Sequence, residues 1–262
     1  MSKKKGPKIL ILDIETSPII AYVWGLWDQT VSLNQIKSDW HVLSWAAKWL
    51  DEKTVMQEDQ RRSKDIEDDR KLLQGIWKLL DEADIIVTQN GKAFDQKRLN
   101  ARFILNGMKP PSSYKHVDTK QLASKHFGFT SNKLEYLTSK LCTKHKKIKT
   151  KKFVGFELWK QCLAGNVAAW DEMRQYNIMD VLSLEELYKR LIPWDNRINM
   201  ALYTEDLEAV CSCGSTKFKK NGYSYTSIGK YQRYSCASCG AESRSAKNEF
   251  SKDKRAMLRR KD

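Results

Sequence analysis

The sequence predicts an α/β protein that ends in a small cysteine-rich module. Short runs rich in β-branched residues and leucine alternate with stretches of helical periodicity, which is the pattern of a sheet flanked by helices. The composition changes after Trp194, and beyond Ala209 the chain is rich in Cys, Gly, Ser, Tyr and Lys. We therefore expect a boundary between about 195 and 210, with parts at residues 1–200, 201–245 and a basic tail at 246–262.

The individual elements follow from local patterns. Short apolar runs predict buried strands at 8–12 and 84–88. Apolar residues at helical spacing, with Pro193 ending the last stretch, predict helices at 66–82, 94–106, 118–127, 133–142 and 170–192. Asp118 is expected to cap the helix that it begins. In the C-terminal module, residues 217–225 and 230–234 predict a hairpin around Gly229.

Tryptophan is concentrated between residues 22 and 50, where the chain has Trp24, Trp27, Trp40, Trp45 and Trp49. Because aromatic side chains bury a large apolar area, we expect them in the core rather than as a platform for nucleic-acid bases. The segment predicts one or two antiparallel strands, and Trp45 and Trp49 also fit a short helix.

The charge balance points to a polyanion. Lys and Arg number 47 against 32 Asp and Glu, a formal net charge of +15, which favours nucleic acid as the partner. No apolar run is long enough to span a bilayer, and no signal-peptide core follows the basic start, so we expect no membrane association and a cytoplasmic location. Six cysteines in such a chain favour reduced thiols or metal ligands.

Four acidic residues and a tyrosine form the pattern with most chemical content. Asp13 and Glu15 follow a buried strand and point to one face, because side chains alternate along a strand. Asp95 begins a helix, and Tyr176 and Asp180 are four residues apart on one helix face. Carboxylates in a buried setting are costly unless ions compensate them, and Mg²⁺ or Mn²⁺ selects carboxylate oxygens. The pattern predicts a divalent-metal site.

Three motifs carry a family resemblance, namely Asp13-Ile14-Glu15-Thr16, Asn90-x-x-x-Phe94-Asp95 and Tyr176-x-x-x-Asp180. Over about residues 8–194 they resemble the exonuclease motifs of the DEDD superfamily in its tyrosine branch, notably stand-alone phage or bacterial exonucleases related to the proofreading domains of family B polymerases. The resemblance implies an RNase H-like mixed sheet, 3′–5′ exonuclease activity and two bound Mg²⁺ or Mn²⁺ ions.

The resemblance also implies a role for each residue. Asp13 would bridge both ions, Glu15 and Asp180 would complete the site of the ion beside the attacking water, and Asp95 would hold the second ion. Tyr176 would orient the attacking water, since a phenol with a reference pKa of ~10 is a poor base at neutral pH. Two such ions stabilise both the entering and the leaving oxygen.

Further residues are candidates for substrate binding, namely Thr16, Asn90, Phe94, Lys146 and Lys147. Asn90 and Phe94 would position a 3′ end, or serve as a turn residue and a core residue. The basic run at 144–152 lies either beside the substrate strand or in a solvated loop. We expect a single-stranded 3′ end as substrate, with DNA favoured over RNA. The alternatives are an RNase H-like endonuclease and a zinc-dependent nucleic-acid-binding protein with a non-catalytic nuclease fold.

The C-terminal module has two cysteine pairs, Cys211 with Cys213 and Cys236 with Cys239. Four soft ligands on glycine-containing turns predict a tetrahedral structural Zn²⁺ site, although the Cys-x-Cys spacing of the first pair departs from the usual form. The module resembles a zinc ribbon, similar to those preceding helix-turn-helix modules in insertion-sequence transposition proteins. Its interleaved basic and aromatic residues predict nucleic-acid binding, and a protein-docking role is the competing interpretation. The tail at 252–262 is expected to be a disordered or helical arm.

Overall fold

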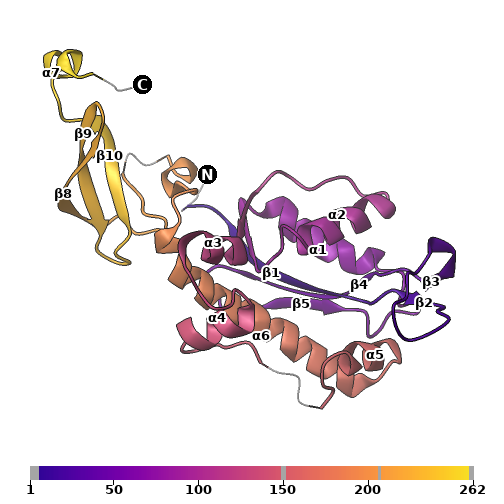
Figure 1. The fold of residues 1–262 in the computed structure, drawn as a ribbon. Helices are drawn as coiled ribbons and strands as arrows, with labels where there is room; N and C mark the ends of the chain where they lie inside the picture. Colours follow the sequence, from indigo (N-terminus) through magenta and orange to yellow (C-terminus); the bar gives the residue numbers. More distant parts are fainter. Residues whose placement is uncertain (1–5, 149–151, 206–207, 260–262) are drawn as a thin grey trace. The chain divides into compact units, whose positions relative to one another are not determined.

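The computed structural model describes residues 6–148, 152–205 and 208–259. The chain divides into two compact units, one formed by Lys8–Tyr188 and the other by Lys189–Asp262 with Met1–Pro7 (Figure 1). No helix in the described ranges is long and apolar enough to cross a membrane.

The first unit is built on a five-stranded mixed sheet in the order β5-β4-β1-β6-β7. Its strands are β1 (Ile9–Thr16), β4 (Val42–Trp49), β5 (Met56–Asp59), β6 (Ile85–Thr88) and β7 (Lys115–Asp118). The pairs β1–β4 and β4–β5 are antiparallel, whereas β1–β6 and β6–β7 are parallel. This arrangement confirms the predicted α/β class with an RNase H-like mixed sheet.

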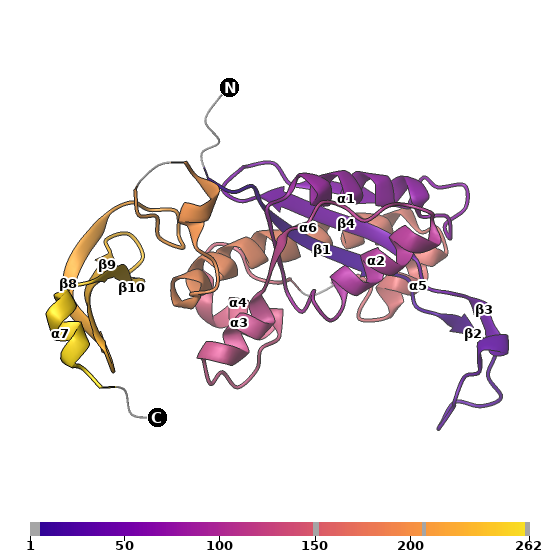
Figure 2. The same cartoon turned by 90° about the horizontal axis from the view of Figure 1, so that it is seen from above.

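Helices cover both faces of this sheet (Figures 1 and 2). One face packs against α1 (Arg70–Glu82) and α2 (Asp95–Leu105), and the other packs against α5 (Glu157–Leu163) and α6 (Val167–Leu191). The shorter helices α3 (Thr119–His126) and α4 (Leu134–Leu141) follow β7. Asp118 caps α3 as predicted, because its side chain accepts from the backbone N–H groups of Lys120 and Gln121.

Side chains of β1 point alternately to the two faces of the sheet. Leu10, Leu12 and Ile14 belong to the core that contains α1 and α2, so Asp13 and Glu15 point to the opposite face, where α6 lies. The two carboxylates share a face, as predicted. The strand runs on to Thr16, however, so both lie inside β1 rather than after its end.

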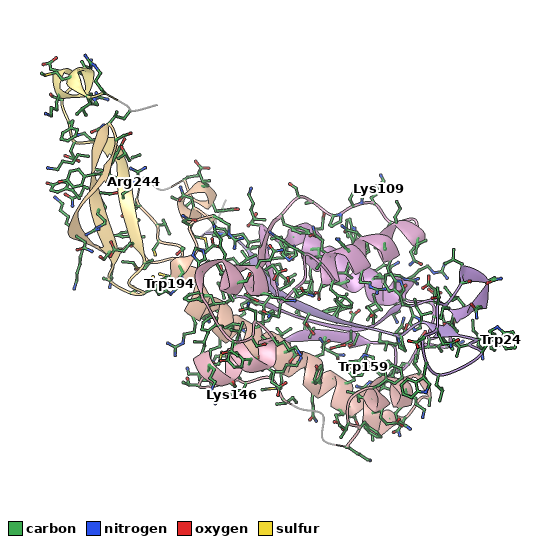
Figure 3. The ribbon with its side chains drawn as sticks, viewed as in Figure 1. Trp24, Lys109, Lys146, Trp159, Trp194 and Arg244 are labelled. Carbon is green, nitrogen blue, oxygen red and sulfur yellow. The ribbon has the colours of Figure 1, made fainter. Side chains whose placement is uncertain are left out.

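The expectation that the tryptophans near residues 22–50 are core residues is wrong for two of them. Trp24 is 98 % exposed and Trp27 is 83 % exposed, in the segment between β2 (Ile20–Ala21) and β3 (Ile36–Ser38) (Figure 3). These two short strands pair with each other and not with the main sheet, so the segment between them does not enter the core. Trp45 and Trp49 lie on β4 rather than on a short helix, and Trp45 is buried.

Several elements have no counterpart in the sequence prediction. β7 reads Lys-His-Val-Asp, and its strand conformation comes from pairing with the apolar β6 rather than from its own composition. β5 and α5 are similarly short and were not predicted. Elements of this length carry too few residues to display a period.

The second unit contains a three-stranded antiparallel sheet in the order β10-β9-β8. The predicted hairpin is present as β8 (Phe218–Thr226) and β9 (Gly229–Cys236), and β10 (Glu242–Asn248) adds a strand that was not predicted. The short helix α7 (Lys252–Met257) follows, with Ser251 as its N-cap. Pro193 lies in a short 3₁₀ turn directly after α6, where a proline is expected to stop a helix.

Candidate active site and comparison with known proteins

Three carboxylates converge on the α6 face of the sheet. One oxygen each from Asp13, Glu15 and Asp180 lies within 4.8 Å of the others. Asp180 is only 3 % exposed, and its Oδ1 atom has no hydrogen-bond partner among the described residues. A buried carboxylate oxygen without a donor is costly, and a cation satisfies it. The donor set of hard oxygens fits Mg²⁺ or Mn²⁺.

The pKa values of the three carboxyls also indicate a site for a cation. Burial and the nearby charge of Asp180 raise the pKa of Asp13 well above its usual range, and the same two causes raise the pKa of Glu15 to about 8. Burial likewise raises the pKa of Asp180, against the opposing effect of the Lys147 ammonium. A cluster of this kind needs positive charge if its members are to be ionised at neutral pH.

Asp95 lies beside the three carboxylates but outside the group that meets within 4.8 Å. It begins α2, is 4 % exposed, and its Oδ1 accepts a 3.2 Å hydrogen bond from the backbone N–H of Ile14. Ile14 is the residue between Asp13 and Glu15, so this bond fixes the start of α2 against the acidic part of β1. Burial raises the pKa of Asp95 to about 7.

Lys147 and Tyr176 complete one side of the acidic group. The Nζ atom of Lys147 is 2.5 Å from Oδ2 of Asp180 and 4.4 Å from the centre of the Tyr176 ring. Burial and the charge of Asp180 raise the pKa of Tyr176 to about 12, so its hydroxyl is neutral at physiological pH. Lys147 also hydrogen-bonds that hydroxyl. The neighbouring Lys146 is exposed, whereas Lys147 is half-buried beside Asp180 (Figure 3).

Glu186 on α6 holds the segment that delivers Lys147. Its carboxylate accepts from the backbone N–H groups of Thr143, Lys144 and His145, at 2.7 to 3.2 Å. Although burial works in the opposite direction, these donors lower the pKa of Glu186 to about 2. Part of the predicted basic run is therefore anchored, while 149–151 lies outside the described residues.

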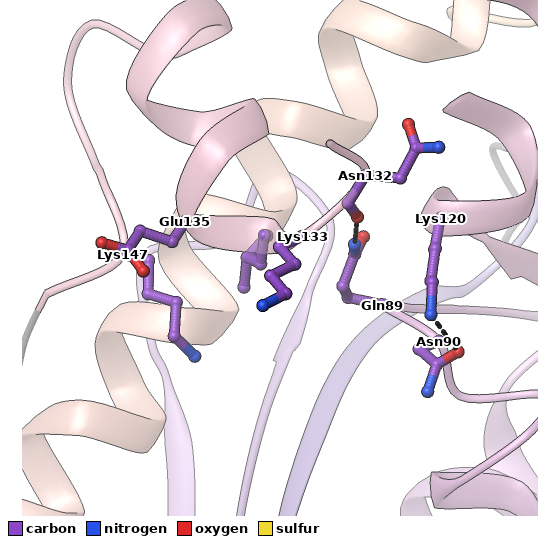
Figure 4. A pocket seen from close by; sticks show the side chains of 8 residues that line it. Gln89, Asn90, Lys120, Asn132, Lys133, Glu135 and Lys147 are labelled. Atoms are coloured by element: carbon purple, nitrogen blue, oxygen red, sulfur yellow. Dashed lines mark hydrogen bonds between the residues drawn. The ribbon is translucent and has the colours of Figure 1, made fainter. Parts of the chain in front are cut away.

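A pocket of about 280 Å³ lies next to this segment (Figure 4). The pocket lies between the residues that follow β6, α3, the start of α4 and Lys147. The lining residues are Gln89, Asn90, Lys120, Asn132, Lys133, Leu134, Glu135 and Lys147. Asn90 has a left-handed backbone with φ 67°, and its N–H donates to Asp118 at 3.0 Å. Lys120, Lys133 and Lys147 bring three ammonium groups to the pocket.

The remaining predicted substrate-binding residues lie apart from this pocket. Phe94 precedes α2 and packs partly buried against the α1–α2 core, with the Arg98 guanidinium 5.4 Å from its ring centre. This position fits the alternative interpretation of Phe94 as a core residue. Thr16 is the last residue of β1 and half-buried.

Two residues of the site were missed by sequence reasoning. Asn177 is fully buried and its side-chain amide donates to Oδ2 of Asp13 at 2.7 Å. The indole of Trp159 hydrogen-bonds Glu15, and its ring meets Tyr176 edge-on with centroids 6.2 Å apart. Asn177 precedes Asp180 by three residues on the same helix, so its spacing was a usable signal. Nothing in the local sequence around Trp159 indicates its partner.

The four cysteines of the second unit also converge. Their sulfurs lie within 4.8 Å of one another, with Cys211 3.5 Å from Cys239 and Cys213 3.8 Å from Cys236. Sulfurs bound to one zinc at about 2.3 Å lie about 3.8 Å apart in a tetrahedron. Each pair is on a turn closed by a glycine with positive φ, Gly214 at 85° and Gly240 at 77°. The geometry suits a tetrahedral metal site.

Comparisons with known proteins agree with this fold. No curated protein sequence matches the chain. Among solved structures, a family B DNA polymerase from the hyperthermophilic archaeon Pyrobaculum calidifontis is similar, with a TM-score of 0.54 and 15 % sequence identity. The similarity covers 86 % of this chain and 32 % of the polymerase, so this chain spans about a third of that protein.

The sequence itself carries the family assignment. The family model of the RNase H superfamily matches residues 10–192, which contain the mixed sheet, the three converging carboxylates and all of α6. This chain therefore belongs to the RNase H superfamily.

Proposed function

We propose that this protein is a 3′–5′ exonuclease that hydrolyses nucleic-acid phosphodiesters with two divalent cations, with DNA favoured over RNA. The observation that carries the proposal is the convergence of Asp13 and Glu15 from β1 with Asp180 from α6, beside Asp95 and Tyr176. Residues more than 160 positions apart meet at one point, where Asp180 is buried and Asp13 and Glu15 are half-buried. A solvated set of surface carboxylates does not converge in this way.

Asp13, Glu15 and Asp180 would hold one cation, and Asp13 with Asp95 would hold the second. Divalent cations bound there would supply Lewis-acid stabilisation of the entering and leaving oxygens. Asn177 keeps Asp13 in position by donating to its Oδ2 atom, which leaves Oδ1 for a cation. Because Lys147 occupies only Oδ2 of Asp180, the unpartnered Oδ1 is the atom available to a cation.

Tyr176 is suited to orienting water rather than to removing a proton. Its pKa of about 12 keeps the hydroxyl neutral, and Lys147 fixes the oxygen by a hydrogen bond. The hydroxyl proton then remains as a donor toward the acidic group. Lys147 additionally supplies positive charge beside a site that receives a phosphate.

The pocket next to Lys147 would take the strand that leads to the reacting phosphate. Lys120, Lys133 and Lys147 line it, and Asn90 shares its wall. Lysine ammonium groups bind phosphates as point charges, so this pocket favours the backbone of the strand over a particular base. Thr16 and Lys146 remain candidate contacts for the substrate strand.

The test is degradation of matched DNA and RNA strands, each with a 5′ label, in the presence of Mg²⁺ or Mn²⁺. We expect a ladder of products shortened from the 3′ end, and we expect a terminal 3′ phosphorothioate to slow it. Early release of the 5′ label as a mononucleotide would contradict the polarity. Cutting of a circular single strand would favour the endonuclease alternative, and absence of all hydrolysis would favour a non-catalytic binding protein.

We further propose that Cys211, Cys213, Cys236 and Cys239 hold one structural Zn²⁺. A small sheet such as β8–β10 buries few apolar residues, and a metal is a common means of stabilising a module of this size. Elemental analysis of the full chain should give about one zinc per molecule.

A further inference from the structure

The three-stranded sheet of the second unit has two unlike faces. Directly paired residues of neighbouring strands point to the same side, and successive residues alternate. The register pairs Phe218 with Cys236, Lys220 with Tyr234, Tyr223 with Gln232 and Tyr225 with Lys230. A shift of register between Lys220 and Tyr223 keeps these two on one side, because their partners Tyr234 and Gln232 are two residues apart on β9. One side of β8 and β9 therefore gathers the residues that we call the aromatic face, namely Phe218, Lys220, Tyr223, Tyr225, Lys230 and Tyr234.

Two rings of the aromatic face are exposed, and the other two pack against each other. Tyr225 is 65 % exposed and Tyr223 is 41 % exposed. The Nζ atom of Lys230 lies 3.8 Å from the centre of the Tyr223 ring, a cation–π contact. Phe218 and Tyr234 meet edge-on with centroids 6.4 Å apart. Rings held in this way lose little conformational entropy when a ligand stacks on them.

Both faces of the sheet have basic residues, and the acidic residue lies on only one of them. The three strands, all of whose residues the structure describes, contain six Lys or Arg residues and a single acidic residue, Glu242. Glu242 pairs with Ser235 across the sheet and so lies on the opposite face, 3.6 Å from Arg233. In β8 and β9, the aromatic face therefore has lysines at positions 220 and 230 and no carboxylate.

Exposed tyrosine rings next to lysines favour one kind of ligand on the aromatic face. Every unpaired base offers a π-face to a tyrosine ring, and lysines between the rings attract the phosphates that link the bases. A duplex hides those π-faces inside its base stack. A docked protein would be expected to meet aliphatic side chains, and β8 and β9 contribute no Leu, Ile, Val or Met to this side.

We propose that the aromatic face binds single-stranded nucleic acid, with bases stacked on Tyr223 and Tyr225 and phosphates held by Lys220 and Lys230. The inference is separate from the proposed hydrolysis, because stacking and phosphate contacts at this face require neither the acidic residues nor a divalent cation. Binding through such a face tolerates sequence, since stacking does not read base edges.

Binding is measured with the full-length protein and a labelled oligothymidylate of about 12 nucleotides, a length within the site sizes of such single-strand-binding surfaces. No Mg²⁺ or Mn²⁺ is added, and the oligonucleotide is checked to be intact afterwards. Tyr223→Ala and Tyr225→Ala should each raise the Kd about tenfold, the loss expected for one stacked base. Tyr225→Phe keeps the ring and should stay within about twofold of the wild type.

Lys219 and Lys220 provide a matched control, because they are adjacent, equally charged and on opposite faces. Lys220→Ala should weaken binding and reduce the slope of log Kd against log salt by about 0.7, and Lys219→Ala should change both less. Zinc content and the unfolding temperature of each variant report whether the module remains folded.

Three results would overturn the proposal: an unchanged Kd in both tyrosine variants, equal losses from Lys219→Ala and Lys220→Ala, or a duplex of the same length bound as tightly as the single strand. If an alanine variant loses its zinc, the decision rests on the comparison of Lys219→Ala with Lys220→Ala, which leaves every ring in place. Failure of hydrolysis with binding intact would count against the nuclease proposal alone.

Discussion

The side-chain amide of Asn177 donates a 2.7 Å hydrogen bond to Oδ2 of Asp13, and its carbonyl oxygen accepts from the Ser44 hydroxyl at 3.2 Å. One buried residue of α6 is therefore bonded to both β1 and β4. The orientation of Asp13 depends on this bond, so Asn177 acts as a positioning residue for the acidic group.

Asn177→Ala should lower the hydrolysis rate about 10- to 100-fold, the usual effect of removing a residue that orients a metal ligand. Weaker apparent affinity for Mg²⁺ should accompany the loss, because Asp13 becomes free to rotate. Ser44→Ala removes only the more distant bond and should have a smaller effect. Rate and Mg²⁺ titrations compare the two variants, and equal effects would show that general destabilisation is responsible.

Asp13→Asn and Asp180→Asn should abolish hydrolysis while the chain remains folded. Each substitution keeps the shape of the side chain but removes a charge that a divalent cation needs. Without added metal, Asp13→Asn should unfold at a higher temperature than the wild type, because burial and the charges of Asp180 and Glu15 raise the pKa of Asp13. Asp180→Asn should not, because it also breaks the ion pair with Lys147. Metal-stimulated cleavage near the wild-type rate in either variant would refute their assignment.

Tyr176→Phe should slow hydrolysis about tenfold or more without abolishing it, since the hydroxyl orients water but the acidic residues stay in place. The ring contacts with Lys147 and Trp159 do not need the hydroxyl, so the unfolding temperature should change little. Single-turnover rates at saturating Mg²⁺ separate this effect from metal binding. Identical rates in the two proteins would remove Tyr176 from the reaction.

Glu186→Gln should reduce hydrolysis by loosening the segment that presents Lys147. The pKa of Glu186 is depressed to about 2 in the folded protein, against an ordinary value of about 4.5. A carboxyl with a lowered pKa contributes stability above its unfolded value, and that stability is lost as the pH falls from about 4.5 through about 2. Between pH 4.5 and 2, the free energy of unfolding should therefore fall more steeply with decreasing pH in the wild type than in the variant. Glu157→Gln, on α5, removes the same charge away from this segment and is the control.

Removal of zinc should unfold the C-terminal module and leave the first unit intact. The four cysteine sulfurs form the proposed zinc site in that module, whereas the core around α1, α2 and α6 lies within Lys8–Tyr188. A chain truncated near residue 205 should accordingly keep its hydrolytic activity. Binding to a single strand should become weaker and less dependent on salt, because fewer phosphates are contacted. Loss of all activity on truncation would show that the first unit depends on the module.

Local patterns in the sequence determined the α/β class, most helices, the acidic motifs and the cysteine pairs. The period of two in β1 was enough to place Asp13 and Glu15 on one face, and the spacing of four placed Tyr176 and Asp180 together on α6. These are short-range consequences of backbone geometry, which a sequence displays directly.

Tertiary structure alone decided the remaining features. Lys147 rather than Lys146 reaches Asp180, because Glu186 fixes the preceding loop from a helix that is about 40 residues away. Trp24 and Trp27 are exposed, although tryptophan side chains usually lie in a protein core. Lys220 and Tyr223 are three residues apart and share a face only because the register of β8 against β9 shifts between them. Each depends on pairing between distant segments, and that pairing minimises the free energy of the whole chain rather than of any local window.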